Sequence, residues 1–402
     1  MVQNVIISLG HAVIDFYMNM LPSLMPFIMT KYGLTFTQVG LIIAVRAAAG
    51  SFTQPLFGLF VDRKGSGRTL ILSLIWTSVI MSLIGVAPGY WWLLVITAFG
   101  PLACALYHPL GSALLREGSA PESVGTLTSL YIVAGSVGYA LAPIVSVAIV
   151  SRLGLPGTLF LCIPGLAVAV VLIAMGVLDA RLGRETAIPV EAASEKDGAK
   201  SIFDRSQWLA SSGQVLMLST TAILRSWAYV GLVNFLPIYY VSRGYSPEYG
   251  SYMLSLFLIS GSVGTLLGGR LSDQWGRRPV TAGSLVLALF CLASYLHSSG
   301  AAEIILLAAT GFTLLSSMSV TTVHAQELMV GHTGMAAGLM MGLVYGLGGI
   351  GASFSGWIAD VYSLHTALLT LVVVLIPAII TVLVVPDPHL DALKSQEASS
   401  GV

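Results

Sequence analysis

The chain has 402 residues, of which only 9% are Asp, Glu, Lys or Arg and 56% are hydrophobic, and its mean hydropathy is +0.88. An average soluble domain carries about 25% charged residues, so a soluble protein of this size could not cover its surface with so few charges. The 18 basic and 18 acidic residues cancel, which leaves no net field to attract DNA or RNA. The composition therefore excludes a soluble enzyme, a disordered protein and a nucleic-acid-binding protein.

Long apolar segments follow one another along the whole chain. A helix needs about 20 mostly apolar residues to cross a bilayer, and runs such as 70–86 are too long for strands of a soluble protein. Twelve segments meet this requirement: 5–30, 37–60, 70–88, 91–115, 124–150, 156–178, 209–240, 247–270, 279–297, 301–327, 334–359 and 364–385. The sequence predicts an all-α membrane protein with twelve transmembrane helices.

The basic residues are distributed unevenly between the loops. Thirteen of the 18 lie on the side that also holds both termini, three lie on the other side, and Arg46 and Arg225 lie inside spans. Because cytoplasmic loops carry an excess of Lys and Arg, we expect both termini in the cytoplasm of a multi-pass plasma-membrane protein. The polar segment 179–206 is predicted to be a cytoplasmic linker between two six-helix halves, 1–178 and 207–388, and 389–402 a cytoplasmic tail.

The two halves resemble each other when the chain is shifted by 211 residues. Ser23-Leu24-Met25-Pro26 then falls on Asn234-Phe235-Leu236-Pro237, Gly33 on Gly244, and Asp62 on Asp273. Two parallel repeats imply a pseudo-two-fold axis along the membrane normal. A transport site is therefore expected near the midplane, between the halves.

A repeated loop motif follows the second and the eighth spans. It reads Gly58-Leu59-Phe60-Val61-Asp62-Arg63-Lys64-Gly65-Ser66-Gly67-Arg68 in the first half and Gly269-Arg270-Leu271-Ser272-Asp273-Gln274-Trp275-Gly276-Arg277-Arg278 in the second. Both copies resemble the signature loop of the major facilitator superfamily. The resemblance implies the twelve-helix fold of that family and alternating access. The residues predicted to form a cytoplasmic gate are Gly58, Asp62, Arg63, Arg68, Arg116, Asp273, Arg277, Arg278 and Glu327.

A finer resemblance rests on four short stretches. They are Gly10-His11-Ala12-Val13-Ile14-Asp15-Phe16-Tyr17, Gln54-Pro55-Leu56-Phe57-Gly58, Tyr107-His108-Pro109-Leu110-Gly111 and Gly135-Ser136-Val137-Gly138-Tyr139-Ala140-Leu141-Ala142-Pro143. These stretches are similar to the fosmidomycin resistance protein group, which are drug exporters of the bacterial inner membrane. That resemblance implies drug resistance through efflux of a small anionic phosphonate, driven by inward proton flow.

An ionisable residue inside the membrane costs about 2.5–3.5 kcal/mol on insertion scales, so the position of Asp15 within the first span calls for an explanation. His11, Asp15 and Asn19 recur every four residues and therefore share one face of the first helix. His11 and Asp15 can share a proton, which predicts that this pair couples transport to protons. The alternative is an Asp15 locked in a permanent ion pair or hydrogen bond.

Arg46 and Arg225 are the two basic residues inside the spans. A guanidinium suits a carboxylate, phosphate or phosphonate and needs an anion in every state. We expect both to form an anion site in which Asp15 competes with substrate; the alternative for Arg46 is a helix carbonyl or the membrane interface. The other predicted substrate-binding residues, for which simple packing is the alternative, are Asn19, Gln54, Tyr107, His108, Trp227, Tyr229 and Asn234.

The predicted function is proton-coupled efflux of a small organic anion or drug by antiport. Uptake of an organic anion by proton symport is the close alternative, and a divalent-metal transporter using His11, Asp15 and His108 is a remote one. The sequence has no G-x-x-x-x-G-K-S/T, G-x-S-x-G or H-E-x-x-H motif, which favours a gradient-driven transporter over an enzyme. The expected partners are a small anion, protons and the lipid bilayer. We expect a monomer without cofactor or resident metal.

Overall fold

The computed structural model describes residues 2–53, 66–117, 123–179, 205–329 and 333–390, and throughout these ranges the chain is helical, with no β-strand. The helices of the first half are α1 (Val2–Tyr32), α2 (Phe36–Phe52), α4 (Gly67–Ser82), η1 (Leu83–Val86), α5 (Tyr90–Glu117), α6 (Val124–Leu153), η3 (Leu155–Leu161), α7 (Cys162–Ala174) and η4 (Val177–Asp179). Those of the second half are α8 (Arg205–Ser242), α9 (Pro247–Trp275), α10 (Arg277–Leu296), α11 (Ala301–Leu328), α12 (Thr333–Gly338), η5 (Leu339–Leu343), α13 (Val344–Val361), α14 (Leu364–Val373) and α15 (Leu375–Leu383).

These helices confirm the predicted all-α membrane fold. Ten helical segments of the described residues are long and apolar enough to cross a membrane. The other two expected spans correspond to α2, which is shorter, and to α12–η5–α13, which a π-helical turn interrupts. Most of the expected linker 179–206 and of the tail 389–402 lies outside the described residues.

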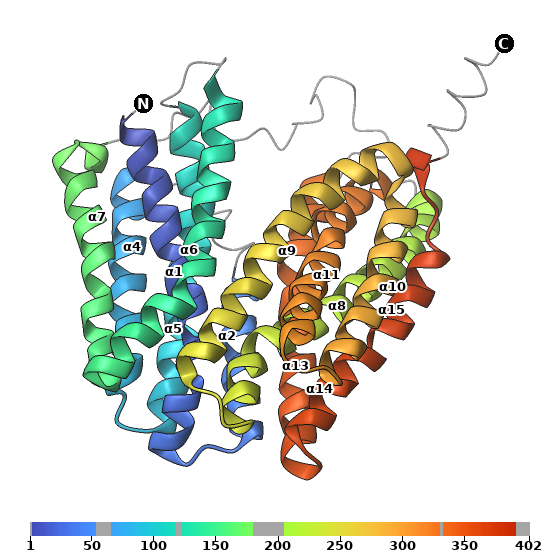
Figure 1. The fold of residues 1–402 in the computed structure, drawn as a ribbon. Coiled ribbons are helices and arrows are strands. Elements are labelled where there is room, and N and C mark those ends of the chain that lie inside the picture. The colour runs from blue at the N-terminus through green and yellow to red at the C-terminus, as the bar shows by residue number, and fades with distance from the viewer. Residues whose placement is uncertain (1, 54–65, 118–122, 180–204, 330–332, 391–402) are drawn as a thin grey trace.

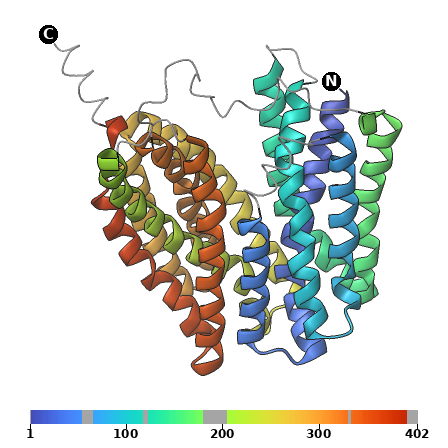
Figure 2. The same cartoon turned by 180° about the vertical axis from the view of Figure 1, so that it is seen from behind.

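The helices form two bundles, one from α1 to α7 and one from α8 to α15 (Figure 1). The start of α1 and the end of α15 lie at the same end of the molecule, which we call the terminal side; the opposite end is the far side (Figure 1). The bundles approach each other at the far side and diverge toward the terminal side in both views (Figures 1 and 2).

The repeat inferred from the sequence is visible in the backbone. Gly33 and Gly244 follow the first helix of each half, and both have positive φ angles, +61° and +85°. Two residues later, Thr35 and Ser246 cap the next helix, each accepting a hydrogen bond from a backbone N–H of the first turn. Glycine adopts positive φ without steric cost and Ser or Thr is a preferred N-cap, so the two halves use the same turn chemistry at matched positions.

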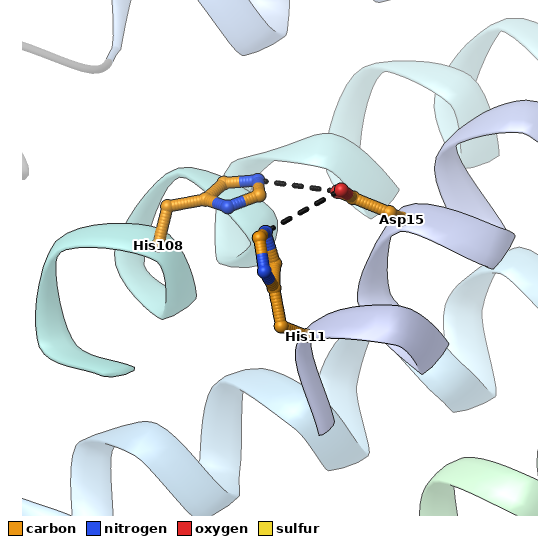
Figure 3. Close-up of side chains that lie close together, drawn as sticks. All are labelled: His11, Asp15 and His108. Carbon is orange, nitrogen blue, oxygen red and sulfur yellow. Dashed lines mark ion pairs between the residues drawn. The ribbon is translucent and has the colours of Figure 1, made fainter. Parts of the chain in front are cut away.

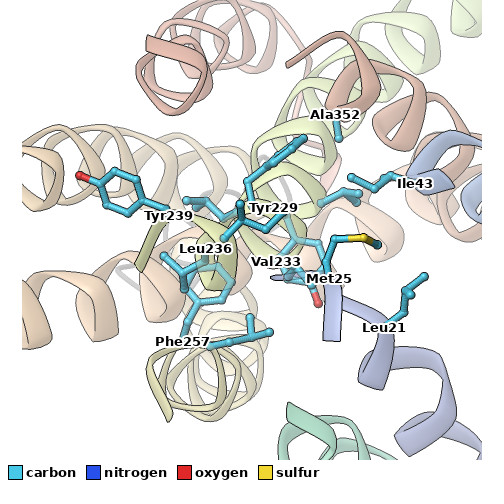
Figure 4. Packing of buried hydrophobic residues seen from close by; sticks show 14 of the residues in the cluster. Leu21, Met25, Ile43, Tyr229, Val233, Leu236, Tyr239, Phe257 and Ala352 are labelled. Atoms are coloured by element: carbon cyan, nitrogen blue, oxygen red, sulfur yellow. The ribbon is translucent and has the colours of Figure 1, made fainter. Parts of the chain in front are cut away.

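Apolar packing joins the halves as well as the helices within each half. One buried cluster contains side chains of α1, α2, α8, α9 and α13, among them Met25, Ile43, Tyr229 and Phe257 (Figure 4). The backbone of α2 lies directly against α13, because a Cβ at Gly40 would stand 2.6 Å from the carbonyl oxygen of Ser353. Small residues thus allow helices of different halves to touch, as is common in membrane bundles.

Polar contacts across the far side accompany this packing. The carboxylate of Asp360, on α13, accepts hydrogen bonds from the backbone N–H groups of Phe36 at 2.9 Å and Thr37 at 2.7 Å, at the start of α2. The hydroxyl of Ser151, on α6, donates to the carboxylate of Glu248, on α9. Two acids of the second half therefore hold the first half at the far side.

Candidate functional site

Three ionisable side chains meet in the interior of the first half. His11 and Asp15 come from α1 and His108 comes from α5, and their side chains point toward one another (Figure 3). The Nε2 atom of His11 lies 3.4 Å from Oδ2 of Asp15, and Nε2 of His108 lies 3.5 Å from Oδ1. Side-chain exposure rises from 9% for His11 to 19% for Asp15 and 36% for His108, so the cluster is accessible from the side of His108.

Neighbouring groups fix the orientation of these rings. Nδ1 of His11 lies 2.6 Å from the carbonyl oxygen of Tyr131, so Nδ1 carries a proton and donates it there. The same ring stacks on Tyr131 with the centroids 3.9 Å apart. Gly135 of α6 permits this packing, because a Cβ there would stand 2.5 Å from the His11 ring and 2.6 Å from Asp15. With Nδ1 occupied, Nε2 of His11 is the atom that faces the carboxylate.

The second half contributes a buried cation. Arg225 of α8 is 2% exposed, and its Nε and Nη1 atoms have no hydrogen-bond partner. Among the described residues, no acidic oxygen lies within ion-pair distance of it; Tyr229 and Tyr345 are the groups that interact with it electrostatically. Since a buried charge without a partner is costly, this guanidinium lacks the counter-charge that its burial requires.

Tyrosines connect Arg225 with the polar groups of the first half. Tyr229 lies near Tyr139 of α6, and Tyr139 lies near Arg46 of α2. The Nη1 atom of Arg46 donates to the carbonyl oxygen of Met18 on α1. A polar band therefore runs from Arg225 through the tyrosines to Arg46, between the two halves.

The structure does not pair Asp15 with either arginine. Asp15 lies against His11 and His108, whereas Arg46 binds a helix carbonyl, which was the alternative considered for it. The expected direct competition of Asp15 for an arginine is thus absent from the described arrangement. The reason is tertiary: α5 brings a second histidine to Asp15, and this pairing between helices has no signature in the spacing of the sequence.

Several predicted substrate-binding residues hold helices together. Tyr107 is fully buried and donates to the carbonyl oxygen of Ile7 at 2.9 Å. Asn19 donates to the carbonyl of Tyr139 at 2.9 Å, and Trp227 donates to Ser355 of α13 at 2.9 Å. Asn234 donates within its own helix to Val230. The geometry thus brings His108, Tyr229 and the arginines toward a shared interior, and gives the other four side chains packing contacts.

The residues predicted for the second-half gate are described, and they contact one another within that half. Arg277 donates to Oδ1 of Asp273 at 2.5 Å, and through Nε and Nη2 to Oε1 of Glu327 at 3.1 and 3.0 Å. The backbone N–H of Arg278 donates to Asp387 at 2.7 Å. Arg68 is the first-half gate residue at the start of α4, and Arg116 is exposed near the end of α5. Gln54, Gly58, Asp62 and Arg63 lie outside the described residues.

The sequence analysis missed three residues of the interior as site residues. Tyr131 orients His11, while Tyr139 and Tyr345 lie along the polar band. Tyr139 belongs to the stretch 135–143 that carries the finer family resemblance, and Tyr131 lies one helical turn before Gly135. A tyrosine hydroxyl inside a transmembrane segment needs a partner, and that requirement was the available signal.

Two helical halves that meet around interior ionisable groups define a membrane transporter of the secondary type. The model of the Major Facilitator Superfamily matches residues 7–350 and 244–400. The chain belongs to this family, and it is a transporter rather than an enzyme.

Relatives and solved structures agree with this assignment. The chain is 29% identical to the uncharacterized MFS-type transporter YfnC of Bacillus subtilis (strain 168) over 96% of this chain and 93% of that one. It is 28% identical to the fosmidomycin resistance protein of Escherichia coli (strain K12), over 90% and 86%. A bacterial homologue of the human lysosomal transporter Spinster, in an inward-facing and occupied conformation, has a TM-score of 0.78 at 15% identity over 95% and 96%.

Proposed function

We propose that this protein exports a small organic anion in exchange for protons. The observation that carries the proposal is Arg225, a guanidinium 2% exposed with two nitrogen atoms unpaired and no acid at ion-pair distance among the described residues. A substrate anion would supply the missing partner, and a planar group such as a carboxylate or phosphonate would match the guanidinium fork.

Arg46 supports an anionic substrate from the first half. Its guanidinium contacts a helix carbonyl, and no acid in the described part of the chain lies at ion-pair distance from it. Together with Arg225 it would place positive charge in both halves, on either side of the tyrosines. Two relatives agree in kind: one is named for fosmidomycin resistance, and a probable nitrate/nitrite antiporter, NarK1 of Thermus thermophilus, is 27% identical over 64% of this chain and 58% of that one.

His11 and Asp15 are the groups that we assign to proton coupling. A neutral His11 directs a lone pair at the Asp15 carboxylate, an arrangement that a proton on either group stabilises. The exposure of His108 gives water a route to the cluster. Because Asp15 and the arginines are not paired, coupling would act through the conformation of the two halves rather than through one shared ion pair.

With both termini in the cytoplasm, as the distribution of basic residues predicts, the described conformation faces inward. The halves are held together at the far side by α2 against α13 and α6 against α9, and they diverge toward the termini (Figure 2). Symport remains the competing direction, because uptake and export would use the same acid and the same cations.

Binding of ligand to the purified protein tests the anion site. We expect phosphonates or carboxylates to raise the melting temperature and cationic drugs to leave it unchanged; ligand at 100 times its Kd stabilises by about 2.7 kcal/mol. Arg225→Lys should weaken binding strongly, since the bidentate fork is lost. Arg270→Lys, at an exposed position of α9, is the matched control. Equal affinity in wild type and Arg225→Lys would overturn the assignment.

Counterflow in proteoliposomes, with and without a proton gradient, tests coupling and direction. Asp15→Asn keeps the shape of the side chain and removes its charge, so we expect proton-driven transport to be lost while substrate binding to Arg225 persists. Asp15→Glu should restore part of the coupling. Full proton-driven activity in Asp15→Asn would show that Asp15 does not couple transport to protons. Accumulation of substrate inside the vesicles, driven by an inward proton gradient, would establish symport.

A further inference from the structure

His11, Asp15 and His108 have the composition and spacing of a transition-metal site. Within the part of the chain that the structure describes, they are the one group of three potential ligands, and their ligand atoms all lie within 4.8 Å of one another. Tetrahedral bonds of about 2.0–2.1 Å place neighbouring ligand atoms roughly 3.3–3.4 Å apart. The two nitrogen–oxygen separations, 3.4 Å to Oδ2 and 3.5 Å to Oδ1 of Asp15, are close to that edge length, and a shift of the side chains would bring all three ligand atoms around one ion.

The hydrogen bonds around the cluster determine which ring nitrogens face its interior. Because Nδ1 of His11 donates to the carbonyl of Tyr131, its Nε2 offers a lone pair toward Asp15. Histidine ligands of metals typically donate their other N–H to such a backbone carbonyl, which fixes the tautomer and the ring. Nε2 of His108 lies 3.1 Å from the thiol of Cys104; if it accepts that S–H, a metal would have to displace the thiol from its lone pair.

Two imidazole nitrogens and one carboxylate thus converge. We propose that this cluster binds one divalent transition-metal cation of the Zn²⁺ type, through Nε2 of His11, Nε2 of His108 and the carboxylate of Asp15. Two imidazoles and a carboxylate favour such an ion over Mg²⁺ or Ca²⁺, which prefer oxygen ligands. Three protein ligands leave a fourth position open, on the exposed side of His108.

Arg46 sets the strength of this binding. Its guanidinium reaches the carbonyl of Met18, one turn from Asp15 on α1, and it interacts electrostatically with Cys104 beside His108. A cation so close opposes the binding of a second cation. Removal of the Arg46 charge should therefore tighten metal binding, an outcome that misfolding could not produce.

Co²⁺ alone is the probe, titrated into the full-length protein in lipid nanodiscs and followed by its visible absorption, which is intense in four-coordinate sites. We expect one Co²⁺ per chain, displaced by Zn²⁺. His11→Ala and His108→Ala should each weaken binding by at least tenfold, Arg46→Gln should strengthen it, and His297→Ala, at an exposed position at the end of α10, should leave it unchanged.

Two results would overturn the proposal: no Co²⁺ band in the wild type, or an equal band in wild type and His108→Ala when both melt at the same temperature. The titration uses neither substrate nor a proton gradient. Its outcome is therefore independent of whether the protein is an antiporter. If the tests of anion binding at Arg225 or of proton coupling at Asp15 gave negative results, the Co²⁺ titration would still decide whether the cluster binds a metal.

Discussion

The contact of Asp360 with the start of α2 allows the contribution of one side chain to far-side closure to be measured. Its carboxylate accepts from the N–H groups of Phe36 and Thr37, which are among the donors left without intrahelical partners at the start of α2. An exposed acid at a helix N-terminus contributes up to about 1 kcal/mol. Asp360→Asn keeps one acceptor oxygen and removes the charge. The equilibrium between far-side-closed and far-side-open forms should thus shift toward open by roughly fivefold.

Spin labels across the far side can report this shift. Suitable sites are Arg152 at the end of α6 and Tyr362 after α13, both exposed, in a protein whose native cysteines have been replaced. Double electron–electron resonance should show a larger population at the long distance in Asp360→Asn. Asp273→Asn, an acid of the same half on the terminal side, is the control and should not increase that population. An unchanged distribution in Asp360→Asn would refute the closure role of this carboxylate.

The pH dependence of the same contact has a definite sign. Asp360 lies beyond the expected end of the eleventh span; burial acts to raise its pKa, but hydrogen bonds from Thr37 and Phe36 outweigh this and hold the pKa below its ordinary value. Its contribution to closure is therefore complete above about pH 4, the usual pKa of Asp, and is lost as pH falls through the lowered pKa. Wild type and Asp360→Asn should differ by a constant amount between pH 5 and 8; a difference that varies there would contradict the reasoning.

Three further outcomes are expected. Gly138→Ala should lower the melting temperature, because a Cβ would stand 1.8 Å from the carbonyl oxygen of Ala12, whereas Gly283→Ala, with nothing within 4 Å, should not. Glu248→Gln should open the far side less than Asp360→Asn, because Glu248 accepts one hydrogen bond from the Ser151 hydroxyl whereas Asp360 accepts two from the N-terminus of α2. Arg277→Lys should reduce thermal stability, since one ammonium cannot reproduce the contacts of the guanidinium with two acids, and an unchanged melting curve would argue against a role in holding α9, α10 and α11.

The fold was predictable because each membrane span is identified by a long apolar run in its own part of the sequence. The length of each apolar run determines the length of its helix. A glycine with positive φ follows the first helix of each half, at Gly33 and Gly244, and an N-cap residue begins the next helix, at Thr35 and Ser246. Both preferences are local properties of the residue type and can be read from the sequence. The neighbourhood of His11 and Asp15 was likewise predictable, since residues four apart in a helix lie on one face.

Contacts between helices could not be derived from the sequence, which named His108 together with His11 and Asp15 only as ligands in a remote alternative function. His108 meets Asp15 because α5 packs on α1 where Gly10 leaves room for the hydroxyl of Tyr107. Such a register depends on the fit of two surfaces rather than on any spacing along one helix. The hydrogen bonds of Asp360 to α2 have the same origin, as their partners lie more than 300 residues apart in the chain.

The separation of Asp15 from Arg225 leads to one last prediction. If substrate binds Arg225 while Asp15 remains with His11 and His108, the two residues act on ligand affinity independently in one conformation. A double-mutant cycle of Arg225→Lys and Asp15→Asn, with binding of a phosphonate measured calorimetrically, should then be additive within about 0.5 kcal/mol. A direct Asp15–Arg225 ion pair in the ligand-free protein would instead produce a coupling energy of 1 kcal/mol or more, because each single substitution would release the other group. Additivity would place proton coupling in the motion of the halves, and strong coupling would place it in competition for a single arginine.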